Sequence, residues 1–221
     1  SESSTLIVKA PPGAGKSTLV PLALLEDVWL KDQKILMLEP RRLAAKTIAT
    51  RMADLLGESV GETVGYRIRF DTKVSSNTKL EVLTEGILTR MIHQDNGLEG
   101  IGLIIFDEFH ERSIHADVAM ALCREAQQVL RPDLRILVMS ATLDMPELSR
   151  MLNAEVVESL GRQYPVEVQY SGESDIRLLP DLVTRVVESA MKKHDGDALV
   201  FLPGQGEIKK CEEILKKTLK G

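Results

Sequence analysis

The sequence is poor in cysteine and histidine. Its 221 residues include two cysteines, Cys123 and Cys211, and no Cys-x-x-Cys pair. This excludes a disulfide framework, and both cysteines fall within helical patterns, which favours structural thiols. His110 and His115 are five residues apart and therefore do not share one helix face, which argues against a metal site. The sequence also has no internal repeats and no low-complexity tracts.

Long apolar runs and excess positive charge are also missing. No apolar run approaches the roughly 20 residues of a membrane span. The first residues, SESS, lack the basic start and apolar stretch of a signal peptide. We therefore expect a cytoplasmic protein without a membrane partner. The net charge is −5, so any nucleic-acid binding must come from a local groove and not from a global basic field.

An apolar content of 43% over 221 residues is enough to form a substantial core. This length fits one full domain and part of another. Strand-like apolar runs alternate with helical patterns, which predicts an α/β fold with a parallel sheet covered by helices. The helical pattern at 43–56 ends at Gly57, a natural left-handed cap, and 64–70 has the alternation of a half-buried strand. The predicted buried strands are 6–9, 35–38, 80–83, 103–106, 136–139 and 198–202.

Residues 6–18, LIVKAPPGAGKST, are an apolar strand that runs into a glycine-rich loop and a helix. Gly13 and Gly15 permit a sharp turn whose N–H groups converge on phosphate oxygens. Lys16 would reach the β- and γ-phosphates, and Ser17 would hold Mg²⁺. Ala10 stands where the usual pattern begins with glycine, which leaves the loop geometry intact. The predicted nucleotide-binding residues of this loop are Ala10, Pro11, Pro12, Gly13, Ala14, Gly15, Lys16, Ser17 and Thr18, and the predicted ligand is ATP with Mg²⁺.

A second catalytic element follows the buried run 103–106. Asp107 and Glu108 come directly after that run, at the carboxyl end of a predicted parallel strand. Ligands bind at this edge of open parallel sheets. We expect Asp107 to contact Mg²⁺ and Glu108 to orient and deprotonate the attacking water, while Lys16 contacts the phosphates.

Periodicity breaks at residues 158–165, and a strand, a helix near 180–193, another strand and a Lys/Glu-rich amphipathic helix follow. We place a domain boundary near Gly161. The expected domains are 1–160, which would bind ATP, and 161–221, which is small for an α/β domain and is expected to be the start of a second one.

Six motifs in order carry a resemblance over nearly the whole chain. APPGAGKST, EPRRLAA, TEGIL, DEFH, SAT and LVFLPGQGEI resemble motifs I, Ia, Ib, II, III and IV of the DEAH-box branch of superfamily 2 helicases, and are most similar to the bacterial HrpB type. Phe109 stands where the DEAH name has alanine, a departure shared with that type that leaves Asp107 and Glu108 in place. The resemblance implies RecA-like domains and an ATP-dependent helicase.

The resemblance also implies roles for further residues. Arg51 matches the place of an arginine that stacks on adenine. His110 would couple the catalytic edge to motif III, Ser140-Ala141-Thr142. The strand-binding residues implied by motifs Ia and Ib are Arg41, Arg42 and Thr84, with Arg69 a weaker candidate. The partner would be single-stranded nucleic acid, and RNA follows from the resemblance alone, because no residue here reads the 2′-hydroxyl.

The sequence contains no counterpart of motif V or of the family's arginine-finger motif. We therefore expect a piece of a longer enzyme that binds ATP and hydrolyses it slowly. The alternatives are a P-loop kinase or GTPase-like switch, a DNA-directed translocase, and a non-catalytic nucleotide- or nucleic-acid-binding module. No arginine-rich lid and no Asn-Lys-x-Asp guanine reader supports the kinase or GTPase reading, and intact Lys16, Asp107 and Glu108 argue against a non-catalytic one.

Overall fold

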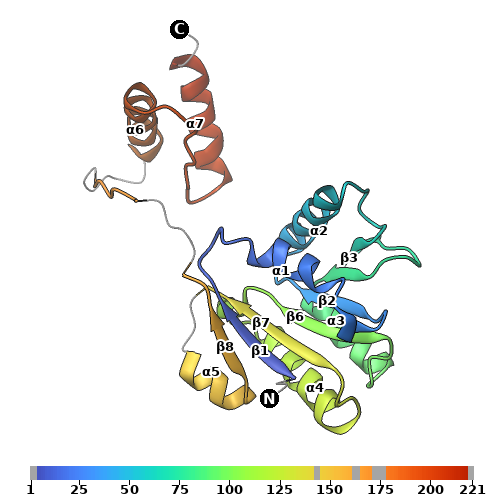
Figure 1. The fold of residues 1–221 in the computed structure, drawn as a ribbon. Helices are drawn as coiled ribbons and strands as arrows, with labels where there is room; N and C mark the ends of the chain where they lie inside the picture. The colour runs from blue at the N-terminus through green and yellow to red at the C-terminus, as the bar shows by residue number, and fades with distance from the viewer. Residues whose placement is uncertain (1–3, 142–144, 161–164, 171–177, 219–221) are drawn as a thin grey trace. The chain divides into compact units, whose positions relative to one another are not determined.

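The computed structural model describes residues 4–141, 145–160, 165–170 and 178–218 (Figure 1). Strands and helices alternate through the first 160 residues, as the sequence predicts. The elements in chain order are β1 (Thr5–Lys9), α1 (Lys16–Leu24), the 3-10 helix η1 (Val28–Leu30), β2 (Lys34–Leu38), α2 (Arg42–Leu56), β3 (Val64–Ile68), β4 (Asp71–Lys73), β5 (Leu80–Leu83), α3 (Glu85–Gln94), β6 (Ile101–Phe106), the 3-10 helix η2 (Phe109–Glu111), α4 (Ile114–Val129), β7 (Arg135–Ser140), α5 (Met145–Leu152), β8 (Glu155–Glu158), α6 (Leu179–Lys193) and α7 (Gln205–Thr218).

The described strands form one eight-stranded sheet in the order β4-β3-β5-β2-β6-β7-β1-β8. Every neighbouring pair is parallel except the β3–β4 hairpin. The α/β class with a mostly parallel sheet is therefore confirmed. Because parallel strands present their carboxyl ends at one edge, the segments that follow β1, β2, β5, β6 and β7 emerge together.

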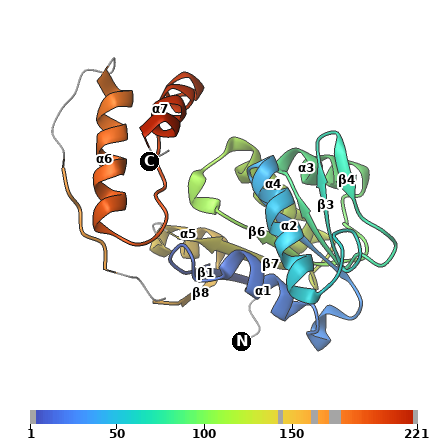
Figure 2. The ribbon, with the colours of Figure 1, turned by 90° about the horizontal axis from the view of Figure 1, so that it is seen from above.

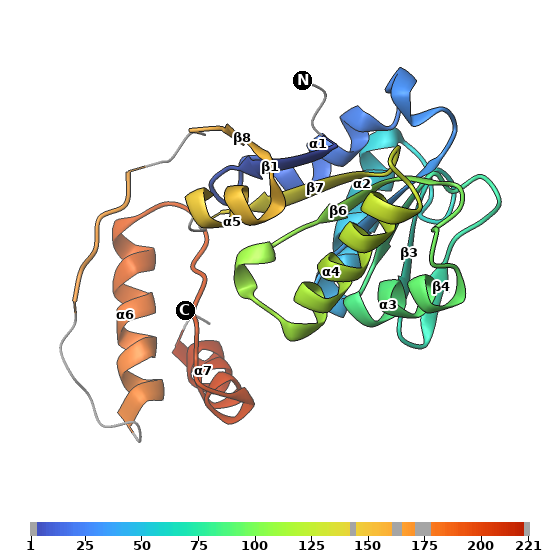
Figure 3. The same cartoon turned by 90° about the horizontal axis from the view of Figure 1, so that it is seen from below.

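The central strands are buried on both faces of the sheet, which explains why they are continuous apolar runs. Along β2, Leu36 and Leu38 pack beneath α3, α4 and α5, while Ile35 and Met37 pack beneath α1 and α2. Figure 2 shows the face that carries α1 and α2, and Figure 3 shows the opposite face. Cys123 of α4 is fully buried in the core, as expected of a structural thiol, and burial raises its pKa to about 12.

The chain separates into two compact units, Ser1–Gln163 and Tyr164–Gly221. In the second unit, helices α6 and α7 pack against each other, and Cys211 is buried with its Sγ 3.8 Å from the Pro180 carbonyl oxygen. The boundary that we predicted at Gly161 lies outside the described residues, so the assignment of 1–160 and 161–221 as domains stays a prediction.

The sequence reading was wrong at several points of strand placement. Residues 198–202, read as a buried strand, form no strand, and Leu199 and Phe201 are largely exposed. A strand needs a hydrogen-bonded neighbour, and none pairs with 198–202 in the described part of the second unit. The strand expected soon after residue 165 is likewise absent from 165–170. The strand predicted at 64–70 ends at Ile68, and Phe70 adopts a left-handed φ of 68° with 90% exposure.

Candidate nucleotide site at the carboxyl edge of the sheet

The loop between β1 and α1 has the backbone that its glycines allow. Gly13 and Gly15 both have φ of 78°, a left-handed conformation that favours glycine. Gly15 is the N-cap of α1, and its carbonyl accepts the Leu19 N–H at 2.8 Å. A Cβ at Gly15 would lie 2.8 Å from Leu19 Cδ1. The loop therefore ends at a helix N-terminus, where free N–H groups and the helix dipole favour an anion.

The loop is attached to the neighbouring strand at its other end. The Ala10 N–H donates to the Ser140 carbonyl of β7 at 3.1 Å, and the Ala14 N–H donates to the Pro11 carbonyl at 3.3 Å. Pro12, Gly13 and Ala14 are exposed, while Lys16 is buried. Motif III, which contains Ser140, thus borders the loop through backbone contact. Thr142 of this motif lies outside the described residues.

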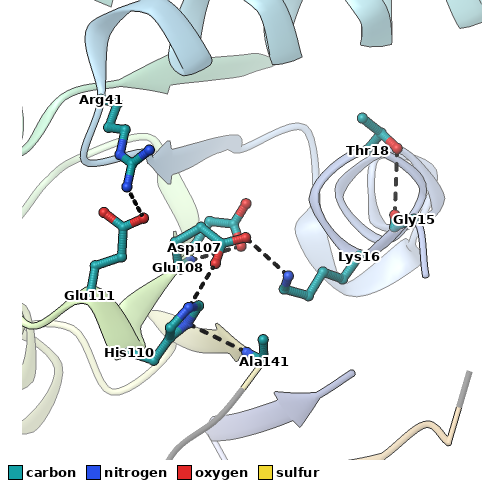
Figure 4. A network of polar contacts seen from close by, with 9 residues as sticks. All are labelled: Gly15, Lys16, Thr18, Arg41, Asp107, Glu108, His110, Glu111 and Ala141. Carbon is teal, nitrogen blue, oxygen red and sulfur yellow. Dashed lines mark hydrogen bonds and ion pairs between the residues drawn. The ribbon is translucent and has the colours of Figure 1, made fainter. Parts of the chain in front are cut away.

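A polar chain joins the loop to the segment after β6 (Figure 4). The Lys16 Nζ lies 3.0 Å from Glu108 Oε1, with the lysine side chain 5% exposed. Glu108 Oε2 lies 3.3 Å from His110 Nε2, and His110 Nδ1 accepts the Ala141 N–H at 3.5 Å. Both histidine contacts are satisfied by the neutral tautomer that carries its proton on Nε2. The chain therefore runs from the phosphate loop through the carboxylate to motif III.

Backbone conformation aims Glu108 toward Lys16. Glu108 has φ of 49° and is the N-cap of η2, so the chain turns sharply as it leaves the strand. Asp107 is 96% buried; its Oδ1 accepts the Glu108 N–H at 2.9 Å, while its Oδ2 has no protein partner among the described residues. Burial raises the pKa of Asp107, and the neighbouring Ser17 hydroxyl opposes that rise. A buried carboxylate oxygen beside a serine hydroxyl is the donor set that Mg²⁺ takes in P-loop proteins, so the residues fit this ion.

Glu39, which follows β2, is a feature that the sequence reading passed over. It is 3% exposed, and its Oε2 has no hydrogen-bond partner in the described structure. Burial, with the charge of Asp107 next in size, raises the pKa of Glu39 to about 8. The signal available in the sequence was an acidic residue directly after the apolar run 35–38.

The residues implied for nucleic-acid and adenine binding differ in their surroundings. Arg41 is 72% exposed and pairs with Glu111 of η2 at 2.8 Å, and Arg42 is exposed at the start of α2. Thr84 is the N-cap residue of α3, at the carboxyl end of β5. Arg51 is exposed on α2. These residues therefore flank the same sheet edge or lie on the helix beside it.

Arg69 follows the carboxyl end of β3, which is parallel to β5 and ends at the same sheet edge. It lies in the β3–β4 turn, where its guanidinium stacks 4.7 Å from the Phe70 ring. The other arginine of this segment, Arg67, is engaged with a buried carboxylate. Arg67 and Lys34 both contact Glu81 of β5, which is 2% exposed. This buried carboxylate with two cations ties β2, β3 and β5 together, and no sequence pattern links these three positions.

The described residues lack two further features. No group of three or more His, Cys, Asp and Glu side chains is placed to hold a metal ion there. The same part of the chain has no helix of sufficient length and apolarity to cross a membrane.

A mostly parallel sheet with a glycine loop at the end of β1 and an Asp-Glu pair at the end of β6 defines a RecA-like P-loop fold. The model of the DEAD/DEAH box helicase family matches residues 1–151, and the chain belongs to this family. The chain is 50% identical over 215 residues to the ATP-dependent RNA helicase HrpB of Escherichia coli K12, covering 97% of this chain and 26% of that protein. It is 34% identical to an ATP-dependent RNA helicase HrpA homolog of Haemophilus influenzae, covering 98% and 17% respectively.

Solved structures agree with this assignment. The crystal structure of the E. coli DEAH/RHA helicase HrpB matches with a TM-score of 0.91 at 48% identity, over 99% of this chain and 28% of that one. A crystal structure of the E. coli DExH-box NTPase HrpB matches with a TM-score of 0.76 at 48% identity, over 98% and 27%. The family resemblance and the RecA-like fold inferred from the sequence are therefore confirmed. The chain spans about a quarter of the length of HrpB.

Proposed function

We propose that this chain is the ATP-binding N-terminal part of an ATP-dependent RNA helicase. The observation that carries the proposal is the 3.0 Å approach of Lys16 Nζ to Glu108 Oε1, which joins the phosphate loop and the Asp-Glu pair at one sheet edge. The names of the similar proteins support ATP and RNA as ligands. In this proposal, residues 1–160 are the nucleotide-binding domain and 161–221 begin a second RecA-like domain.

Lys16 holds the β- and γ-phosphates together with the free backbone N–H groups where the loop meets the N-terminus of α1. Its Nζ is buried and faces Glu108, so its charge is directed into the site and away from solvent. Ser17 and Asp107 hold Mg²⁺, which when bound neutralises charge on the phosphates. Arg51 stacks on the adenine ring, which requires no base-specific hydrogen bond.

Glu108 accepts the proton of the attacking water, since its carboxylate follows Asp107 directly and lies 3.0 Å from Lys16 Nζ, the group that contacts the phosphates. His110 holds Glu108 through Nε2 and contacts Ala141 through Nδ1. A movement of motif III, Ser140-Ala141-Thr142, would therefore shift His110 and with it the carboxylate of Glu108. This contact offers a physical route between motif III and hydrolysis.

Arg41 and Arg42 contact phosphates of a single strand, together with Thr84 at the neighbouring strand end and Arg69 as the weakest member. Contacts of this kind position a strand without reading its sequence. They also make binding salt-dependent, with a slope of log K against log salt of about −0.7 for each neutralised phosphate.

The test measures ATP hydrolysis by the full-length protein that carries this chain, with Mg²⁺ and with added single-stranded RNA or DNA. We expect turnover that RNA stimulates and that Glu108→Gln removes, while ATP binding is retained. Stimulation by DNA alone would replace RNA with DNA as the substrate. ATP binding without any turnover would show that these motifs only scaffold ligands.

A further inference from the structure

The described structure has three buried side-chain atoms without a hydrogen-bond partner, all in residues at the carboxyl edge of the sheet. They are Glu39 Oε2, Asp107 Oδ2 and Ser140 Oγ. The three residues stand at the carboxyl ends of β2, β6 and β7, which are consecutive strands of the sheet. An unsatisfied buried polar group costs about 1–3 kcal/mol. Native proteins keep such groups where a ligand, ion or water completes them.

Glu39 and Asp107 are placed side by side by the register of the sheet. Leu38 of β2 aligns with Phe106 of β6, and the Asp107 N–H donates to the Leu38 carbonyl at 3.0 Å. Met37 and Ile105, two residues earlier, pack in the core beneath α1 and α2. Because side chains alternate along a strand, the carboxyls of Glu39 and Asp107 face the same side as α1, the helix that begins at Lys16.

The cations of the described structure do not neutralise Glu39. Lys16 is engaged with Glu108, and the Arg41 guanidinium is engaged with Glu111. Glu81 offers a direct contrast, because it is equally buried on the adjacent strand β5 and is held by both Lys34 and Arg67. Glu39 therefore has the burial of a structural carboxylate and a hydrogen bond from the Arg41 backbone N–H, but no cation among the described residues pairs with it.

We propose that Glu39 is a positioning residue for the metal–nucleotide complex: its carboxylate accepts hydrogen bonds from water molecules bound to the divalent cation that Asp107 and Ser17 hold. The proposal rests on the proposed function. Mg²⁺ keeps several of its waters in phosphate sites and is bound by one or two carboxylates directly. A second carboxyl beside Asp107 supplies acceptors for those waters, and outer partners of this kind change metal affinity by about 10–100-fold.

The test measures the metal affinity of the ATP complex and not activity. Mn²⁺, a spectroscopic substitute for Mg²⁺, is titrated into protein with ATP and followed by electron paramagnetic resonance. ATP affinity without metal is measured by calorimetry in the presence of chelator. We expect Glu39→Gln to weaken Mn²⁺ binding about 10–100-fold and to leave the metal-free ATP affinity unchanged. Glu39→Asp should recover part of the loss and serves as the second variant if the first folds poorly.

Glu81→Gln is the matched control, since it removes a buried carboxylate from the neighbouring strand without touching the edge. It should leave Mn²⁺ affinity unchanged. Unchanged Mn²⁺ affinity in folded Glu39→Gln, or an equal loss of ATP affinity with and without metal, overturns the proposal.

A failure of the proposed function would give different results from a failure of the Glu39 proposal alone. If Asp107→Asn weakens Mn²⁺ binding and Glu39→Gln does not, only the role of Glu39 is wrong. If Asp107→Asn has no effect, the metal does not sit at this edge, and both assignments fall. Absence of ATP binding by the unmodified protein refutes the nucleotide site itself and Glu39 with it.

Discussion

The ion pair between Arg41 and Glu111 should compete with nucleic acid for the arginine. Glu111 Oε1 lies 2.8 Å from Arg41 Nη2, and the arginine side chain is 72% exposed. A phosphate can therefore reach Arg41, but only by displacing Glu111 or sharing the guanidinium with it. Replacement of Glu111 by glutamine removes the competing charge and keeps the side-chain shape. We predict that Glu111→Gln binds single-stranded RNA more tightly than the unmodified chain.

The structure limits how large the gain is. Exposed ion pairs contribute about 0.2–1 kcal/mol, so the release of Arg41 should raise the association constant by a factor of about 1.4 to 5, since about 1.4 kcal/mol corresponds to tenfold. The salt slope should stay the same, because Arg41 already counts as one phosphate contact. Arg41→Ala should make the slope shallower by about 0.7, the share of one phosphate on a single strand.

The assay is fluorescence anisotropy of a labelled oligoribonucleotide over a range of salt concentrations. Glu125→Gln, which removes an exposed carboxylate on α4, controls for the general effect of net charge. A double-mutant cycle with Arg41→Ala isolates the pair. The reasoning is refuted if Glu111→Gln binds no better than Glu125→Gln, or if its gain persists when Arg41 is alanine.

Four further predictions concern stability, turnover and ATP binding. Arg67→Met should lower the free energy of unfolding by about 2–3 kcal/mol, because it removes a charge-assisted hydrogen bond from a buried carboxylate, and urea titration that shows less than 0.5 kcal/mol would contradict this. Burial alone would raise the pKa of Glu81, but its cation partners outweigh burial and lower it. The stabilising contribution of Glu81 is therefore present above the usual value of 4.5 and is lost as pH falls through the lowered pKa. Urea titrations at pH 7 and pH 3 should show that the free energy of unfolding falls less between these two pH values in Glu81→Gln than in the unmodified chain. Glu108→Gln should reduce the turnover of the full-length protein by about 10²–10⁴ with ATP affinity retained, and parental turnover would exclude Glu108 as the base. Gly15→Ala should impair ATP binding, because its φ of 78° and the 2.8 Å approach to Leu19 both oppose a Cβ, and unchanged affinity by calorimetry would show that the loop adapts.

The local parts of this protein could be predicted from its sequence because they depend on neighbouring residues. The runs 35–38 and 103–106 are buried on both faces, so their apolar character shows directly, and Gly15 and Gly57 adopt the left-handed φ that their positions require. The phosphate loop and the Asp107-Glu108 pair could likewise be predicted, because each is a short contiguous segment of the sequence.

Contacts between distant segments could not be predicted in this way. Arg41 and Glu111 are 70 residues apart, and only the β2–β6 pairing brings their ends together. The burial of Glu39 could not be predicted either, since it depends on the neighbouring strand and not on its own segment. The reading of 198–202 failed for the related reason that an apolar run becomes a strand only when another strand pairs with it.

The nucleotide site itself is tested most directly by calorimetric titration of ATP with Mg²⁺ into this chain and its Lys16→Ala variant. Lys16 is buried at the loop and its charge faces the proposed phosphate position, so its removal should weaken ATP binding by at least about tenfold, the loss of one charge-assisted hydrogen bond of about 1.5–3 kcal/mol. The unfolding midpoint should change little, because the lysine supports a ligand cradle and not the core. A folded Lys16→Ala variant that binds ATP with unchanged affinity would contradict the account.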